Sequence, residues 1–145
     1  MRSSRMIAVD ANVISELMKV QPDPTVIEWA GGVEDFELAV PVVVAAEVLS
    51  GLDRLPPGPR RRRLETALDA FFARLGAGRV LTLGVAGAVE YAHVMTGRAR
   101  AGMPMSTMDA LIAATCREHG ASLATRTTKG FIATGVRLID PWTLA

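Results

Sequence analysis

Residues 6–10 read Met-Ile-Ala-Val-Asp, a short apolar run that ends on a carboxylate. The run has the length and composition of a buried strand, and residues 12–19 after it predict a helix. Two other acids stand in similar surroundings: Glu47 in Val-Val-Val-Ala-Ala-Glu (42–47) and Asp109 in Ser-Thr-Met-Asp-Ala-Leu (106–111). We expect each acid to lie where a strand gives way to a helix. Because carboxylates are rarely buried without a partner, all three require a common explanation.

Segments typical of strands alternate with segments typical of helices along the rest of the chain. We expect strands at residues 6–9, 36–40, 79–83, 122–125 and 136–139, and helices at 12–19, 24–29, 43–52, 86–100 and 106–119, with a long helix after the Pro-Pro-Gly-Pro break at 56–59. This alternation predicts a parallel α/β sheet with helices on both faces. The segments follow one another too closely for two domains, so we expect residues 1–145 to form a single domain.

Composition restricts the function classes only loosely. Of 145 residues, 50% are hydrophobic and 21% are charged, with a net charge of +1, which neither demands nor excludes a nucleic-acid partner. Cys116 is the single cysteine, which excludes an internal disulfide and fits a reducing compartment. No apolar run is long enough to span a bilayer. We therefore expect a cytoplasmic protein without a membrane segment.

The three acids suggest a metal site. In open α/β sheets, ligands bind beyond the carboxyl ends of the strands, where Asp10 lies and where the helices that carry Glu47 and Asp109 are expected to begin. Converging carboxylates repel one another, and Mg²⁺ or Mn²⁺ would remove that conflict. The sequence has no Cys/His cluster typical of zinc, and no phosphate-binding loop or dinucleotide fingerprint. Such a site suits phosphodiester hydrolysis by a metal-activated water.

Each acid also has a structural interpretation. Asp10 is well placed to cap the helix after it, and Ser106-x-x-Asp109 fits a capping box. Glu47 alone fits a solvated helix residue. The positively charged run Arg60–Arg63 fits either a solvated helix start or a contact to RNA phosphates. Equivalent placement of all three acids at one sheet edge is what favours a shared site.

Five segments resemble one protein family. Residues 7–17, Ile-Ala-Val-Asp-Ala-Asn-Val-Ile-Ser-Glu-Leu, are similar to the opening of PIN-domain proteins, and among them most resemble VapC and FitB-like toxins. Residues 43–51 and 102–114 resemble the second and third acidic motifs of that family. Residues 120–126 and 135–142 resemble its closing strands. The resemblance covers nearly the whole chain in order.

The resemblance implies a three-layer Rossmann-like PIN domain with a central parallel sheet of four to five strands flanked by helices. It also implies a Mg²⁺-dependent endoribonuclease, with Mn²⁺ as an alternative ion, that is inhibited by a cognate VapB-type antitoxin and forms a homodimer. Asp10, Glu47 and Asp109 would be catalytic, with Asp10 and Asp109 as metal ligands. Asn12 would hold Asp10 in place by hydrogen bonding, and Arg126, near the same edge, is the best candidate for binding substrate phosphate.

The chain departs from the family pattern at two positions. Thr127 and Gly130 stand where the family often has acidic residues. A second metal ion would therefore be held weakly, and the alternative function is a catalytically weak PIN fold that binds RNA or protein. A structure-specific DNA nuclease is a lesser third option.

A stripe of large apolar residues runs along the long helix after the proline break. Its members are Leu64, Leu68, Phe71, Phe72 and Leu75. Their spacing predicts mainly core positions, and the stripe is wide enough for part of it to line a groove for an antitoxin helix, with Trp29 as a further anchor.

Overall fold

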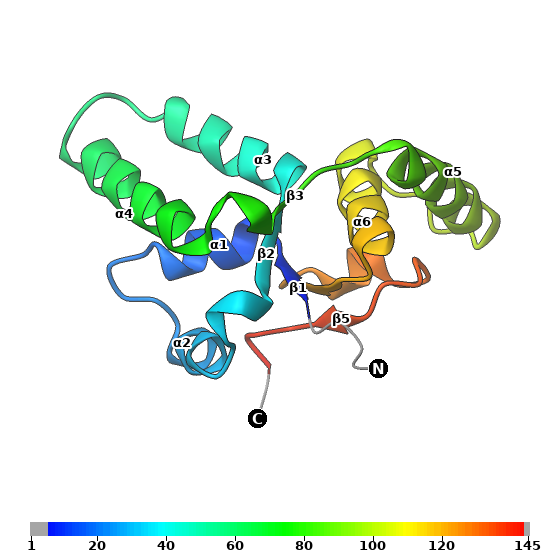
Figure 1. Cartoon of the computed structure of the whole chain (residues 1–145), viewed down its shortest axis with the longest axis horizontal. Coiled ribbons are helices and arrows are strands. Elements are labelled where there is room, and N and C mark those ends of the chain that lie inside the picture. The colour runs from blue at the N-terminus through cyan, green and yellow to red at the C-terminus, as the bar shows by residue number, and fades with distance from the viewer. Residues whose placement is uncertain (1–5, 144–145) are drawn as a thin grey trace.

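In the part of the chain that the structure describes, five short parallel strands form one central sheet (Figure 1). The computed structural model describes residues 6–143. The sheet has the order β3-β2-β1-β4-β5. Its strands are β1 (Ile7–Val9), β2 (Leu38–Pro41), β3 (Val80–Leu81), β4 (Ser122–Ala124) and β5 (Leu138–Ile139).

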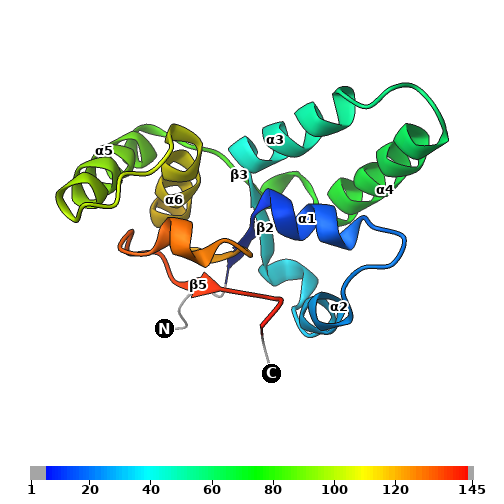
Figure 2. The same cartoon turned by 180° about the vertical axis from the view of Figure 1, so that it is seen from behind.

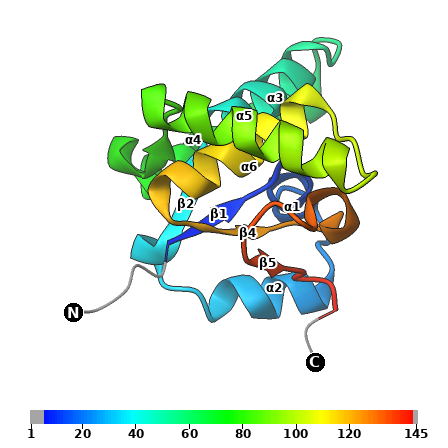
Figure 3. The ribbon, with the colours of Figure 1, turned by 90° about the vertical axis from the view of Figure 1, so that its right-hand side faces the viewer.

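Within residues 6–143, six α-helices cover the sheet. They are α1 (Ala11–Leu17), α2 (Pro24–Gly31), α3 (Val42–Asp53), α4 (Pro59–Leu75), α5 (Val85–Arg100) and α6 (Thr107–His119). Figures 1 and 2 show α1 to α4 gathered on one side of the strands and α5 and α6 on the other. Figure 3 shows α2 and α6 on opposite sides of the sheet. The predicted three-layer parallel α/β architecture is therefore confirmed.

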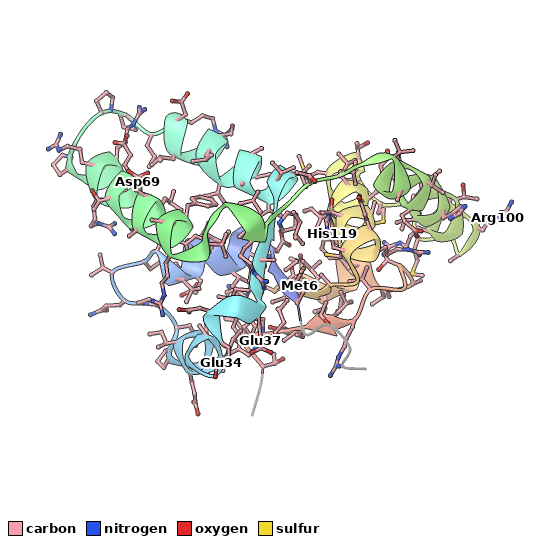
Figure 4. The ribbon with its side chains drawn as sticks, viewed as in Figure 1. Met6, Glu34, Glu37, Asp69, Arg100 and His119 are labelled. Carbon is pink, nitrogen blue, oxygen red and sulfur yellow. The ribbon has the colours of Figure 1, made fainter. Side chains whose placement is uncertain are left out.

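The strands are buried because helices cover both faces of the sheet. Ala8 and Leu123 are completely buried, as are Ala39 and Val40 of β2. Uninterrupted apolar runs are typical of such doubly covered parallel strands. Exposed charged side chains lie at the periphery, as Figure 4 shows for Asp69 on α4 and Arg100 on α5.

The register of the central strands sets the position of the candidate site. Val9 of β1 pairs with Ala124 of β4, so the next residues along the two strands, Asp10 and Thr125, leave the sheet side by side. The backbone N–H of Asp10 still donates to the carbonyl of Ala124, at 2.9 Å. The sheet thus fixes the backbone of Asp10 directly.

The element boundaries differ from the sequence-based prediction in a few places. The described residues contain three 3₁₀ turns that were not predicted: η1 (Asp35–Glu37), η2 (Ala77–Arg79) and η3 (Thr128–Phe131). Because η1 precedes β2 and η2 precedes β3, both strands begin later than predicted. None of the helices in residues 6–143 is both long and apolar enough to cross a membrane.

Candidate active site

Asp10 lies at the carboxyl end of β1 and caps α1, so the predicted capping role is real. Its Oδ1 atom accepts a hydrogen bond from the backbone N–H of Ala11 at 2.8 Å. Its Oδ2 atom accepts from the Thr125 hydroxyl at 2.8 Å, and the residue is only 7% exposed. Both oxygens are therefore oriented by the surrounding structure.

Asn12 supports Asp10 through Thr125 and not by a direct bond. The Asn12 side-chain amide donates to Thr125 Oγ1 at 3.3 Å and accepts from the backbone N–H of Arg126 at 3.2 Å. The backbone N–H of Thr127 also donates to Thr125 Oγ1, at 3.1 Å. Sequence reasoning missed Thr125, which is completely buried. Its only signal was its position directly after the strand that pairs with β1.

Glu47 lies in the second turn of α3, which begins directly after β2. The side chain is half-buried and lines a groove beside α1. Burial raises the pKa of the Glu47 carboxyl, and the negative charges of Asp10 and then Asp109 raise it further. All three carboxylates therefore lie within electrostatic reach of one another, and Glu47 is not simply a solvated helix residue.

Asp109 lies in the first turn of α6 and reaches the same edge by a different route from the one predicted. No strand precedes α6, which follows α5 through the loop at residues 101–106. The helix begins at the edge where Asp10 lies. The Ser106 hydroxyl accepts from the backbone N–H of Asp109 at 3.1 Å, so Ser106 caps the helix as its alternative interpretation held.

The electrostatic environment of Asp109 resembles that of Glu47. Burial raises the pKa of Asp109, the negative charge of Asp10 adds to the shift, and the Ser106 hydrogen bond and the positive charge of Arg98 oppose it. Within residues 6–143, none of the ion pairs includes Asp10, Glu47 or Asp109. Partly buried carboxylates that repel one another are typical of functional sites.

The donor atoms fit a hard divalent cation held mainly by two carboxylates. In the described part of the chain, no three carboxylate, histidine or cysteine side chains are already placed as ligands of one ion. Mg²⁺ does not need such a cage, because it commonly keeps several waters and binds one or two protein carboxylates. Asp10 and Asp109 can supply those oxygens, with Glu47 within electrostatic reach of both.

Arg126 lies directly after Thr125 at the edge of the sheet. Its exposed guanidinium group stacks over the Trp142 ring, 5.0 Å from the centroid. The pKa of Glu16 is lowered chiefly by a hydrogen bond from Lys19, with a smaller contribution from the Arg126 charge. Arg126 therefore flanks the acids from the side of α1 that carries Asn12 and Glu16.

A groove of about 380 Å³ runs between α1, α3 and α4, with Glu47 among its lining residues. Its apolar lining includes Ile14, Leu64 and Leu68, and it also includes Arg60 and Arg63. Part of the predicted apolar stripe therefore lines a groove. Trp29 is not among the lining residues and packs against the core instead.

Gly130 and Thr127 lie beside the acids. A Cβ atom on Gly130 would be 3.6 Å from Asp109 Oδ2, so a side chain at this position would point at the site. The Thr127 and Thr125 hydroxyl oxygens are 3.2 Å apart. The two departures from the family pattern thus fall at the site itself.

Cys116 is not a nucleophile. Burial raises the pKa of its thiol to about 12, and the charge of Asp10 contributes to the shift. The thiol is completely buried and remains protonated at neutral pH.

Comparisons with known proteins agree with this geometry. The PIN domain family matches residues 7–135. The chain is 36% identical to VapC ribonuclease Y4jK of Sinorhizobium fredii over 137 residues, which cover 94% of this chain and 98% of that protein. It is 31% identical to Toxin FitB of Neisseria gonorrhoeae, over 94% of this chain and 99% of that protein.

A solved structure shares the fold almost completely. The crystal structure of FitAcB from Neisseria gonorrhoeae matches with a TM-score of 0.89 and 32% identity, and covers 96% of this chain and 100% of that chain. The chain therefore belongs to the PIN-domain family and, within it, to the VapC and FitB-like toxins.

Proposed function

We propose that this protein is a Mg²⁺-dependent endoribonuclease that acts as the toxin of a VapBC-type toxin–antitoxin pair. The observation that carries the proposal is that Asp10, Glu47 and Asp109 lie within electrostatic reach of one another at the carboxyl edge of the sheet, and that none of them forms an ion pair among residues 6–143. The name of the Sinorhizobium fredii relative, a VapC ribonuclease, supports the same activity.

Asp10 and Asp109 would hold the ion. A bound Mg²⁺ or Mn²⁺ would supply a Lewis acid for a phosphate oxygen and would lower the pKa of water. The raised pKa of Glu47 suits a group that accepts a proton from the attacking water. Thr125 keeps Asp10 Oδ2 in one orientation. Arg126 would bind a substrate phosphate beside the acids.

The test is RNA cleavage by the purified protein with Mg²⁺, with Mn²⁺ and with EDTA. We expect Asp109→Asn to reduce the cleavage rate by about a hundredfold or more, since it removes a metal ligand. The matched control is Asp69→Asn, which changes the exposed carboxylate that Figure 4 shows on the outer surface of α4. Equal activity of the two variants would contradict the proposal.

A second function deserves a test because Gly130 leaves the space beside Asp109 without a fourth carboxylate. In this alternative, the protein is a catalytically weak PIN fold that binds RNA or protein. It predicts that the wild-type protein retards RNA in a gel shift with Mg²⁺ and releases no cleavage product after long incubation.

The proposed partner is an antitoxin that occupies the groove between α1, α3 and α4. An amphipathic helix would place its apolar face on Ile14 and Leu64 and its acidic residues near Arg60 and Arg63. Solved structures with the same fold include a toxin–antitoxin complex. Homodimer formation and a cytoplasmic location remain predictions.

A further inference from the structure

Arg98 of α5 is a buried arginine without a carboxylate partner among residues 6–143. It is only 5% exposed, and none of the ion pairs in that range includes it. Burying a guanidinium group is costly unless its donors are satisfied. Its charge lowers the pKa of Asp109, but its buried donors must be satisfied by the groups that it binds.

Those groups are backbone carbonyls from two separate segments. Arg98 Nε donates to the carbonyl of Met103, in the loop between α5 and α6. Nη1 donates to the carbonyls of Gly130, at 3.0 Å, and Ile132, at 2.7 Å. One planar side chain thus joins the start of α6 to the segment around η3, which Figure 2 shows in orange next to α6.

Both segments bracket Asp109. Met103 lies three residues before Ser106, the residue that caps α6 and bonds the Asp109 backbone. Gly130 faces the Asp109 carboxylate from the other side, with 3.6 Å between its Cβ position and Oδ2. A shift of either segment would change the position of Asp109 or the space in front of it.

The backbone after η3 does not adopt a relaxed conformation. Ala133 has φ 61°, a left-handed value that is unfavourable for alanine. Such residues persist where surrounding contacts hold them in place. The carbonyls on both sides of Ala133 accept bonds from arginines: Ile132 from Arg98, and Thr134 from Arg117 at 2.8 Å.

We propose that Arg98 is a positioning residue that holds the loop before α6 and the wall formed by residues 128–132 in the arrangement needed for metal binding at Asp109. This inference rests on the proposed metal site but not on the RNA-cleaving activity. A guanidinium group is required because its planar fork reaches three carbonyls, whereas a lysine ammonium cannot satisfy the same geometry.

The experiment compares Arg98→Lys with Arg117→Lys, a matched control. Arg117 also bonds a carbonyl of the same loop, but it pairs with Glu90 and lines a different pocket. The readout is the rise in Tm as MgCl₂ is titrated, together with amide hydrogen exchange at residues 128–132. We expect Arg98→Lys to raise the Mg²⁺ midpoint about tenfold and to speed exchange there. Arg117→Lys should lower Tm without moving the midpoint.

Equal midpoints in the two variants would overturn the inference, as would a wild-type protein whose Tm does not respond to Mg²⁺. If Arg98→Lys does not fold, hydrogen exchange in the wild-type protein tests the inference instead. Mg²⁺ is expected to slow amide exchange at residues 128–132. Exchange that Mg²⁺ leaves unchanged would refute the inference. A tenfold midpoint difference in a protein that cleaves no RNA would refute the proposed function and leave this inference standing.

Discussion

Replacing Thr125 by valine tests whether the buried hydroxyl group orients Asp10. The substitution keeps the branched shape and removes one donor, the hydroxyl that lies 2.8 Å from Asp10 Oδ2. Hydrogen bonds to charged groups contribute about 1.5–3 kcal/mol. Asn12 and Thr127 also lose an acceptor, but both residues reach solvent, so water can replace it. We expect a loss of about 2 kcal/mol in unfolding free energy.

The matched control for this substitution is Thr115→Val. Thr115 is also completely buried, but its hydroxyl donates to the Leu111 carbonyl within α6, at 2.7 Å. Loss of that neutral bond should cost about 1 kcal/mol. For a chain of this size, each kcal/mol corresponds to about 2–4 °C in Tm.

Thermal unfolding without metal, followed by a MgCl₂ titration, separates the two variants. Thr125→Val should lower Tm more than Thr115→Val and should weaken Mg²⁺ binding about tenfold, because groups that orient metal ligands have effects of that size. The reasoning is refuted if both variants lose the same stability and bind Mg²⁺ as the wild-type protein does.

Two more predictions concern the charge of the site. Because the pKa values of Glu47 and Asp109 are raised in the folded protein, the folded state binds protons more tightly than the unfolded state, and stability should fall as pH rises. In EDTA, Tm should therefore increase as pH is lowered from 7 toward the ordinary pKa values of Glu47, 4.5, and Asp109, 3.8. Saturating Mg²⁺ should reduce this increase in Tm. A Tm that falls steadily over the same pH range would contradict the raised pKa values of the two carboxyl groups. Gly130→Asp should place a fourth carboxylate beside Asp109. It should lower Tm in EDTA and strengthen Mn²⁺ binding in a calorimetric titration. The control Gly78→Asp, at an exposed glycine with open space around it, should change neither Tm nor Mn²⁺ binding.

The fold was predictable because its strands carry a simple signal. Runs such as residues 6–9 are continuously apolar, which is what burial under helices on both faces requires. The 3₁₀ turns were not predictable in the same way. Asp35–Glu37 has no apolar period, and the turn is capped by a hydrogen bond from the backbone N–H of Glu34 to the Glu37 carboxylate, at 2.9 Å.

The site was predictable only where a residue's position follows from topology. The position of Asp10 at the edge of the sheet was predicted because Asp10 ends an apolar strand, and the structure places it there. Thr125 was not, because its role depends on the register between β1 and β4, which no local pattern encodes. Arg98 has the sequence surroundings of an ordinary helical arginine, and its burial depends on carbonyls about 30 residues further along the chain.

The same charges that suit the site to a metal also work against the folded state without one. Glu47 and Asp109 are partly buried, lie near a third carboxylate and have no ion-pair partner in the described chain, so ionising them at neutral pH costs stability. Arg98 offsets part of that cost at Asp109 through its charge, and the sheet core supplies stability from elsewhere. A ligand that binds only the folded state adds RT ln(1 + [L]/Kd), about 1.4 kcal/mol at ten times Kd. Metal loading would therefore be coupled to folding, and a variant such as Asp109→Asn, which removes a carboxylate whose pKa is raised, should be more stable in EDTA than the wild-type protein.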